Sequence, residues 1–270
     1  MNLNAALTVV LVSIAAAGLS PCAFAAPFPT PRIQPDAEEA KLLKPAAAQD
    51  ASSRALLSST RDALTLPMNV RIGALRAQGP EGYRTLTFIM FDQKASMNER
   101  WKATTAVGRL GGELSVPELE RAYKSSEWFM RSAALMAMQK IDRVRGVRWA
   151  QELLDDKALV VRAAAVDSLA ESRAASSAPA LWRTLYAKSN YSEGESLWIR
   201  RRIVETLASI EGPESKPRFL KALADRDESL HAAAIEGLER ISHERLGAPD
   251  APLSAKRELW LKHAKKSRNL

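Results

Sequence analysis

The chain has 270 residues, a formal net charge of +8 and one cysteine, Cys22. A single cysteine excludes an intramolecular disulfide, and the three histidines stand apart from cysteines or carboxylates at ligand spacing, so we expect no structural zinc site. The positive charge favours anionic partners in general, without choosing among acidic proteins, membranes, cell-wall polymers and nucleic acid.

Residues 1–25 have the pattern of a secretory signal peptide. An uncharged apolar run extends from Leu3 to Leu19, and Ala23-Phe24-Ala25 supplies small residues at positions −3 and −1 of a cleavage site before Ala26. Three alternatives remain: a retained membrane anchor, although this run only marginally spans a bilayer, a buried core helix, and lipid attachment at Cys22, which Pro21 disfavours. We expect cleavage before Ala26 and a periplasmic or secreted mature chain.

Residues 26–52 contain five prolines among alanine, glutamine and aspartate. Prolines at this density prevent a continuous helix, apart from one short turn over Asp36–Leu43, so this segment is expected to be a flexible linker. The folded body is predicted to span residues 53–268. It should open with a capping helix over Arg54–Leu64.

A short, alanine-rich helical motif with a basic residue near its start recurs along this body. Its basic residues are Arg71, Arg100, Arg131, Arg162, Arg200 and His231, at intervals of 29, 31, 31, 38 and 31 residues. A small or apolar residue follows at +3, and an apolar residue follows at +7, with Gln78 as the exception in the first unit. This spacing predicts the first helix of a two-helix repeat, and the period predicts a solenoid.

The second helix of each repeat is predicted from proline, which is favoured at the first helical turn. The predicted starts are Pro80, Pro117, Arg148, Pro179 and Pro217, with Arg148 in the place of proline in the third unit. The expected fold is an all-α, right-handed solenoid of about six helix pairs with capping helices.

The segment from Leu223 to Ala234, followed by Leu238, resembles the HEAT-repeat signature, in particular the short bacterial form also called phycobilisome-lyase-like HEAT repeats. The segment from Leu154 through Arg162 to Leu169 resembles it again. The resemblance covers about residues 65–245 and departs from the family pattern at His231 and Gln78. The family is a scaffold used for unrelated functions, so the resemblance carries no active site over to this chain.

The recurring arginines are expected to be structural. Each can pair with an acidic residue in the preceding turn, such as Asp156 with Arg162 or Glu127 with Arg131, and its aliphatic stem can cover the contact between repeats. A different column is a candidate binding surface. The residues four positions after each second-helix start should reach solvent on the face where solenoids bind, and they are Arg84, Arg121, Glu152, Arg183 and Lys221. Either these cations form an anionic-partner surface or they are an ordinary solvated face.

Most of the six tryptophans are expected to fill core space that alanine leaves open, with Trp182 and Trp128 as the expected exceptions. Trp182 is therefore a candidate partner contact. The long interval between Arg162 and Arg200 places an insertion at residues 188–196, where Tyr191 is a second candidate contact. A tolerated surface insertion explains that loop equally well.

An amphipathic helix is predicted from Leu253 to Arg268. It is expected to cap the array, because its position is that of the last second helix. Its cations offer an alternative role, contact with an anionic surface, and they are Lys256, Arg257, Lys262, Lys265 and Lys266.

No catalytic motif, phosphate-binding loop or cofactor signature stands out, so we expect no catalytic, cofactor-binding or metal-binding residues. The sequence predicts an exported, non-enzymatic scaffold or adaptor that binds a protein partner, which its charge suggests is acidic, within an envelope complex. Two alternatives remain: a peripheral factor on an anionic membrane or cell wall, and an enzyme built on a HEAT scaffold. Nucleic acid is not an expected partner.

Overall fold

The structure is a computed structural model that describes residues 51–268, and the side chains of residues 52–266. The predicted signal peptide, the cleavage site before Ala26 and residues 26–50 of the linker lie outside these residues. The described body opens with α2 (Ala51–Thr65), three residues before the start predicted for the capping helix.

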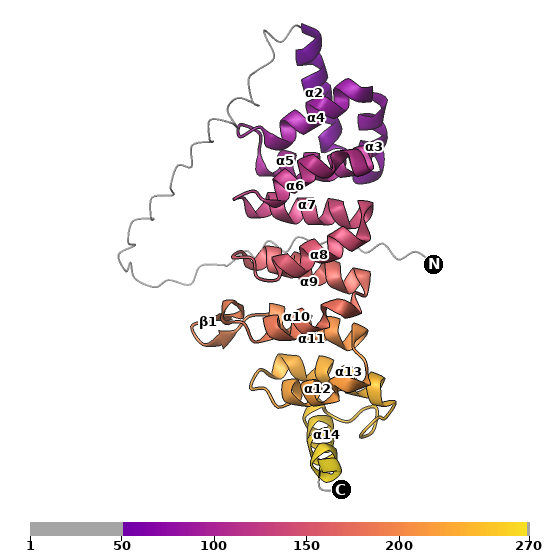
Figure 1. The fold of residues 1–270 in the computed structure, drawn as a ribbon, viewed down its shortest axis with the longest axis vertical. Helices are drawn as coiled ribbons and strands as arrows, with labels where there is room; N and C mark the ends of the chain where they lie inside the picture. The colour runs from indigo at the N-terminus through magenta and orange to yellow at the C-terminus, as the bar shows by residue number, and fades with distance from the viewer. Residues whose placement is uncertain (1–50, 269–270) are drawn as a thin grey trace, which may run out of the picture. The chain divides into compact units, whose positions relative to one another are not determined.

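Helices that follow α2 in the chain form consecutive pairs, as expected for a HEAT-repeat solenoid (Figure 1). Each pair has a first helix that carries the recurring Arg or His and a second helix. The pairs are α3 (Met68–Ala77) with α4 (Gly79–Phe91), α5 (Met97–Gly111) with α6 (Val116–Tyr123), α7 (Trp128–Ile141) with α8 (Arg143–Leu153), α9 (Leu159–Ser172) with α10 (Ala178–Leu185), α11 (Ile199–Ile210) with α12 (Lys216–Leu223), and α13 (His231–Ser242) with α14 (Leu253–Arg268).

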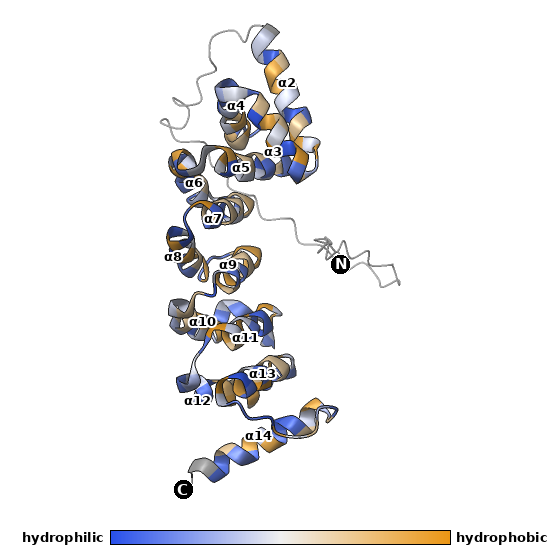
Figure 2. Ribbon diagram, turned by 90° about the vertical axis from the view of Figure 1, so that its right-hand side faces the viewer, coloured by the Kyte–Doolittle hydropathy of each residue, from blue (hydrophilic) through white to orange (hydrophobic). Residues whose placement is uncertain are grey.

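The first helices α5, α7, α9, α11 and α13 form one layer, and the second helices α6, α8, α10 and α12 form the other (Figure 2). Short 3₁₀ turns lead into three of the second helices, at Gly112–Ser115, Ala175–Ser177 and Pro213–Ser215. Two more, at Lys188–Asn190 and Glu228–Leu230, precede β1 (Tyr191–Ser192) and α13. The strand β1 pairs antiparallel with β2 (Glu195–Ser196) in a small hairpin.

Local sequence explains where several helices begin. Ser96 and Glu99 form a capping box at the start of α5, with the Ser96 side chain accepting from the Glu99 amide. Proline occupies the first turn of α4, α6, α10 and α12, as predicted. The predicted start of the third second helix at Arg148 is wrong. Helix α8 begins at Arg143, because the Asp142 carboxylate accepts a hydrogen bond from the Arg145 amide and caps it there.

The predicted core positions are buried. The residues at +3 and +7 of the repeats from α5 onward are almost fully excluded from solvent; they are Ala103, Ala134, Ala165, Ile203 and Ala234, and Val107, Met138, Leu169, Leu207 and Leu238. Gly108 shows how closely the first helices approach, since an added Cβ there would lie 2.7 Å from the Cβ of Ala137. Small residues at these positions therefore permit the stacking.

Both ends of the array are capped. Thr60 of α2 donates to the Gln78 side chain at 2.8 Å, and Gln78 donates to Ser59 at 3.0 Å, which explains the polar residue at this position of the first repeat. At the other end α14 packs on α12 and α13, and its Trp260 is fully buried. This confirms the predicted bounds of the last helix and its position as a cap. Among residues 51–268, no helix combines the length and apolar character needed to cross a bilayer.

Candidate functional site

The recurring basic residues lie at the seams, which are the contacts between the first helices of consecutive repeats. All six are buried, with 1 to 7% exposure; they are Arg71, Arg100, Arg131, Arg162, Arg200 and His231. Buried arginines require hydrogen-bond partners on most of their N–H groups. Their partners therefore define what each seam does.

Three of the arginines, Arg100, Arg131 and Arg200, take a carboxylate partner from the following repeat, and not from the preceding turn as predicted, whereas Arg71 donates to the Leu66 carbonyl. Arg131 donates to both oxygens of Asp156, at 2.6 and 2.7 Å, and Arg200 donates to Asp225 at 2.7 Å. Arg100 makes the same bidentate contact with the carboxylate of Glu127. In the preceding turn these arginines contact backbone carbonyls instead, for example those of Ser125 and Ser126 with Arg131. Each guanidinium is planar and can join two loops at once, which fastens one repeat to the next.

The seam at Arg162 differs because the next repeat carries the insertion. Arg162 Nε donates to the side-chain oxygen of the buried Asn190 at 3.0 Å, and a second nitrogen donates to the Ser189 carbonyl. Asn190 in turn donates to the Thr184 carbonyl at 2.7 Å. The amide thus replaces a carboxylate and anchors the hairpin that follows it.

These seams alter the acidity of the loop carboxyls. Burial raises the pKa of Asp156, but hydrogen bonds from Arg131 and from the Ala158 amide outweigh it, so the pKa lies below its usual value. Asp225 behaves alike: burial raises its pKa, while the bond from Arg200 brings it below the usual value. These loop acids remain ionised and neutralise the buried arginines.

The predicted basic column on the second helices does not form one continuous stripe. Arg84 is exposed and pairs with Glu81 at 2.6 Å, while the Arg121 guanidinium lies 4.0 Å from the centre of the Phe91 ring. Glu152 interrupts the column and accepts a hydrogen bond from Tyr123. Arg121, Arg183 and Lys221 each lie in the last turn of their helices, where a cation opposes the negative end of the helix dipole. Helix stability alone therefore explains much of the column.

The C-terminal part of the column does gather around two adjoining pockets, each of about 250 Å³, which we call the C-terminal pocket pair. One is lined by Trp182, Arg183, Tyr186, Arg218 and Lys221. The other shares Lys221 and is lined by Pro217, Leu220, Ala224, Leu261, Ala264 and Lys265. The helices that supply these residues are α10, α12 and α14. Three of the six predicted partner-binding residues meet at the first pocket.

Cations surround the pocket pair, and no carboxylate appears among its described lining residues. Arg183 is 3.6 Å from Asp155, in a pair that is exposed on both sides, and Lys221 lies 4.5 Å from the Tyr186 ring centre. Arg218 is 3.7 Å from Glu211, whose carboxylate already accepts bonds from Trp182 and Ser215. The cations are thus only loosely neutralised.

The expectation that Trp182 is an exception to core packing is wrong. Its indole is 7% exposed, lies 5.1 Å from the Phe219 ring centre and donates to Glu211. Trp128 is exposed as expected, at 39%. Sequence reasoning missed Trp198, which at 57% is the most exposed large aromatic residue within the described part of the chain. Its position at the end of the insertion was the signal that could have identified it.

Tyr191 does not extend freely into solvent. It is half-buried in the hairpin, and its ring centre lies 4.6 Å from the Arg200 guanidinium. The residues of this insertion that reach solvent furthest are at its tip, where Glu193 and Gly194 both adopt positive φ, as a tight hairpin turn requires. The insertion therefore helps to cover a seam.

The five cations predicted to form an anionic-surface face on α14 fall into two groups. Lys256 donates to the Pro249 carbonyl at 2.8 Å, and Arg257 donates to the Leu223 carbonyl at 2.9 Å, so both fasten α14 to the array. Lys262, Lys265 and Lys266 are exposed. Only these three are available for an anionic surface.

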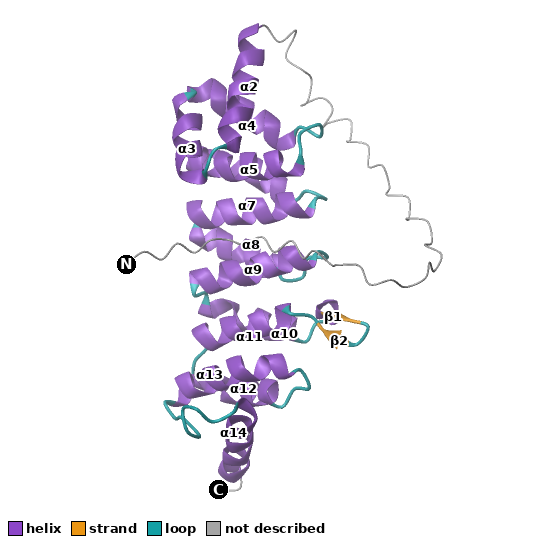
Figure 3. Ribbon diagram, turned by 180° about the vertical axis from the view of Figure 1, so that it is seen from behind, coloured by secondary structure: helices purple, strands orange, loops and turns teal. Residues whose placement is uncertain are grey.

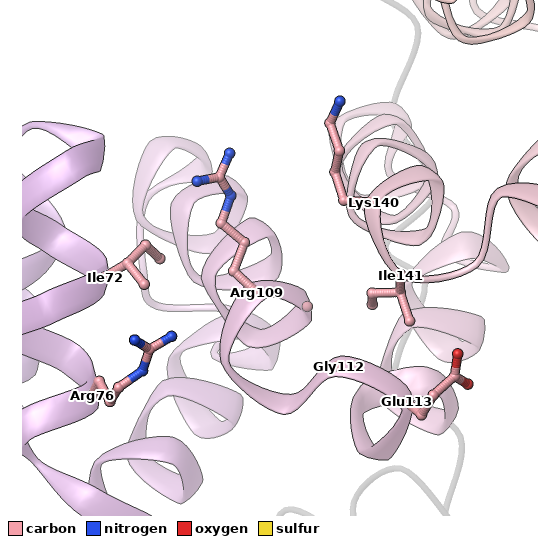
Figure 4. A pocket seen from close by; sticks show the side chains of 8 residues that line it. Ile72, Arg76, Arg109, Gly112, Glu113, Lys140 and Ile141 are labelled. Carbon is pink, nitrogen blue, oxygen red and sulfur yellow. The ribbon is translucent and has the colours of Figure 1, made fainter. Parts of the chain in front are cut away.

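A third, larger pocket of about 600 Å³ lies near the other end of the array. Figure 4 shows Ile72 and Arg76 on one side of it, Arg109 and Gly112 between, and Lys140, Ile141 and Glu113 on the other side. Its three cations stand at the C-terminal ends of α3, α5 and α7, where they oppose the helix dipoles. Within residues 51–268 no group of histidines and acids is arranged to hold a metal ion.

Comparison with known families gives one match, and no curated protein matches the chain. The family model described as HEAT repeats matches residues 88–170, from the end of α4 to α9. HEAT repeats generally mediate protein–protein interactions. The matched residues include the seams of Arg100 and Arg131, and the same arginine contacts continue beyond them at Arg200. Residues 88–170 therefore belong to the HEAT-repeat family, within an all-α array of sequential helix pairs.

Proposed function

We propose that this protein is an exported, non-enzymatic scaffold that binds an acidic, partly apolar segment of a partner protein in the C-terminal pocket pair. One observation carries the proposal. Four cations, Arg183, Arg218, Lys221 and Lys265, surround a lining that is otherwise aromatic and aliphatic and that includes no described carboxylate.

The size of the pockets favours a peptide over a small ligand. Each has a volume of about 250 Å³, whereas pockets that enclose a cofactor or a small molecule usually measure roughly 300 to 1,000 Å³. Two adjoining shallow pockets suit successive apolar side chains of one segment. Cations around them would attract carboxylates on the same segment and accelerate its association.

Removal of the pocket charges tests this docking. The double variant Arg183→Glu, Lys221→Glu should lose specific partners in affinity capture from an envelope extract, and the far-UV circular dichroism spectrum should not change. The matched control is Arg84→Glu, Arg173→Glu, since both residues are exposed and lie outside the pocket pair. If both variants capture the same partners as the wild type, the pocket pair is not the docking site.

Export is a separate part of the proposal and rests on the sequence pattern of residues 1–25. Expression with a C-terminal tag, followed by cell fractionation and N-terminal sequencing, should give a periplasmic or secreted chain that begins at Ala26. A cytoplasmic chain that retains residues 1–25 would contradict export without affecting the docking proposal.

The exposed lysines of α14 favour a second candidate, a peripheral factor on an anionic membrane or cell wall. Lys262 and Lys266 are exposed and line neither C-terminal pocket. If this function holds, the mature protein should co-sediment with phosphatidylglycerol vesicles or with isolated cell wall, and Lys262→Glu, Lys266→Glu should abolish this. Truncation of α14 is a poorer test, because it would remove the buried Trp260 from the core.

A further inference from the structure

The loops that join each second helix to the next first helix lie along one edge of the array, together with the hairpin (Figure 3). Bonds from Arg100 to Glu127, from Arg131 to Asp156 and from Arg200 to Asp225 cross between adjacent repeats at this edge. The N-terminal ends of α5, α7, α9 and α11 therefore follow one another along it. We call this the loop edge.

A large apolar side chain is exposed at the N-terminal end of each of these four helices. Met97 is the first residue of α5 and is 52% exposed, and Trp128 is the first residue of α7. Val160 is the second residue of α9, and Trp198 precedes α11 as its N-cap; they are 53% and 57% exposed. Single exposed apolar residues are normal on a protein surface, but recurrence in four consecutive repeats makes an apolar row.

Exposed cations accompany this row. Lys94, Lys124 and Lys157 lie between the second and first helices of consecutive repeats, and all three side chains are exposed. None of the three is in an ion pair with a carboxylate of the described residues. The loop acids Glu127 and Asp156 are instead turned toward Arg100 and Arg131. Because the buried arginines already neutralise these acids, the outward charge beside Met97 and Trp128 comes from Lys94 and Lys124. The loops beside Val160 and Trp198 are mixed in charge, since they also carry the exposed Asp155, Glu193 and Glu195.

The spacing of the row fits a helix that lies across the repeats. Packed helices are about 8 to 10 Å apart, and seven residues of an α-helix rise about 10.5 Å. A partner helix with an apolar residue at every seventh position would therefore bring one such residue to each repeat. Acidic residues beside the part of that stripe that meets Met97 and Trp128 would face Lys94 and Lys124.

We propose that the loop edge is a second docking surface, which binds an acidic amphipathic helix of a partner protein along Met97, Trp128, Val160 and Trp198. This surface is separate from the C-terminal pocket pair, which lies on the second helices α10, α12 and α14. A scaffold with both surfaces can hold two partner segments at once. The loop edge can bind its helix whether or not the pocket pair binds its own segment.

The test uses a designed probe and the whole folded chain. The probe is a fluorescein-labelled peptide of four heptads, about 28 residues, with leucine at every seventh position on a helix of glutamate and alanine. Fluorescence anisotropy should show saturable binding to the wild type that weakens as salt is added. The variant Trp128→Ser, Trp198→Ser should raise the Kd about tenfold or more. The matched control Met136→Ser, half exposed on α7 outside the row, should leave the Kd unchanged.

The lysines are tested with a charge-matched pair of triple variants. Lys94→Glu, Lys124→Glu, Lys157→Glu should abolish probe binding, whereas Arg76→Glu, Arg109→Glu, Arg173→Glu, at the opposite ends of the first helices, should reduce it only slightly. Equal losses in both triples would overturn the loop edge as the site, as would a wild type that does not bind the probe.

Two further measurements separate this inference from its alternatives. A peptide of the same composition with a proline in each heptad should not bind, and equal binding would overturn a helical occupant in favour of an extended one. The variant Arg183→Glu, Lys221→Glu should bind the helical probe as the wild type does. If it loses the probe, the pocket pair is the binding site and the loop edge is not.

Discussion

The seams at Arg131 and at Arg162 make the same mechanical connection with different chemistry. Arg131 meets the carboxylate of Asp156, and both side chains are less than a tenth exposed. Arg162 meets the neutral amide of Asn190 and the carbonyl of Ser189. The first seam gains Coulomb energy but holds an ion pair that must remain complete. The second holds the buried Arg162 cation with neutral hydrogen-bond acceptors, and the insertion supplies two of them, Asn190 and the Ser189 carbonyl. Repeats can therefore be joined without an ion pair if the loop provides enough acceptors.

Removal of one partner of the ion pair should have the largest effect. Arg131→Met leaves the buried Asp156 carboxylate with the Ala158 amide but no cation and removes the donor to two loop carbonyls, so we expect the free energy of unfolding to fall by about 3 to 5 kcal/mol. Urea denaturation measures this change. Arg183→Met serves as the control, because its pair with Asp155 is exposed and should contribute about 0 to 1 kcal/mol. A loss below about 1 kcal/mol at Arg131 would contradict the structural role of this seam.

Disruption of the amide seam should have a smaller effect. Asn190→Ala removes the acceptor for Arg162 and the donor to the Thr184 carbonyl, at a cost of about 2 kcal/mol. Asn190→Asp restores an acceptor but not the donor, so its stability should lie between wild type and Asn190→Ala. Asn98→Ala, on the exposed start of α5, should show little change. If the aspartate variant is less stable than the alanine variant, the seam does not depend on an acceptor for Arg162.

The smallest of the three expected effects is a difference between the two seams in how the free energy of unfolding depends on pH in acid. The pKa of Asp156 is lower in the folded chain than in the unfolded chain, so its contribution is complete above the unfolded value of about 3.9 and is lost as the pH falls through the folded value. The acceptors that the insertion gives to Arg162, the Asn190 amide and the Ser189 carbonyl, do not titrate there. Asp156→Asn is less stable at neutral pH, but its free energy of unfolding should fall less steeply below about pH 4 than that of the wild type. Equal slopes would show that Asp156 is not ionised in its seam.

Periodicity predicted the fold because every repeat carries the same information. Alanine at +3 and an apolar residue at +7 recur, and each buries the same helix face. The one wrong helix start was predicted at Arg148. There the Asp142 cap starts α8 at Arg143, earlier than the repeat period predicts, and the helix begins without a proline. The N-cap at Asp142 occurs in one repeat only. A pattern that is derived from all the repeats together therefore cannot predict it.

The partners of the arginines could not be predicted from the sequence in the same way. Asp156 lies six residues before Arg162 and 25 residues after Arg131, and both pairs look plausible in one dimension. Only the stacking of the first helices decides between them. The candidate site has the same limitation, because the pocket pair requires α10, α12 and α14 to come together. Three of its cations were predicted, Arg183, Lys221 and Lys265, but Arg218 was missed because it lies outside the repeated column.

Because Arg100, Arg131 and Arg200 each take a carboxylate from the repeat that follows, the array has a direction. A fragment that stopped after α6 would leave Arg100 without the acid of the next loop, whereas one that began in the loop before α7 would leave Glu127 without its cation. During synthesis, Arg100, Arg131 and Arg200 therefore gain their carboxylate partners only when the next repeat is added. His231 ends this dependence. Its imidazole contacts the Asp225 carbonyl of its own repeat at 3.0 Å. The residue at the final seam position therefore needs no carboxylate from a further repeat.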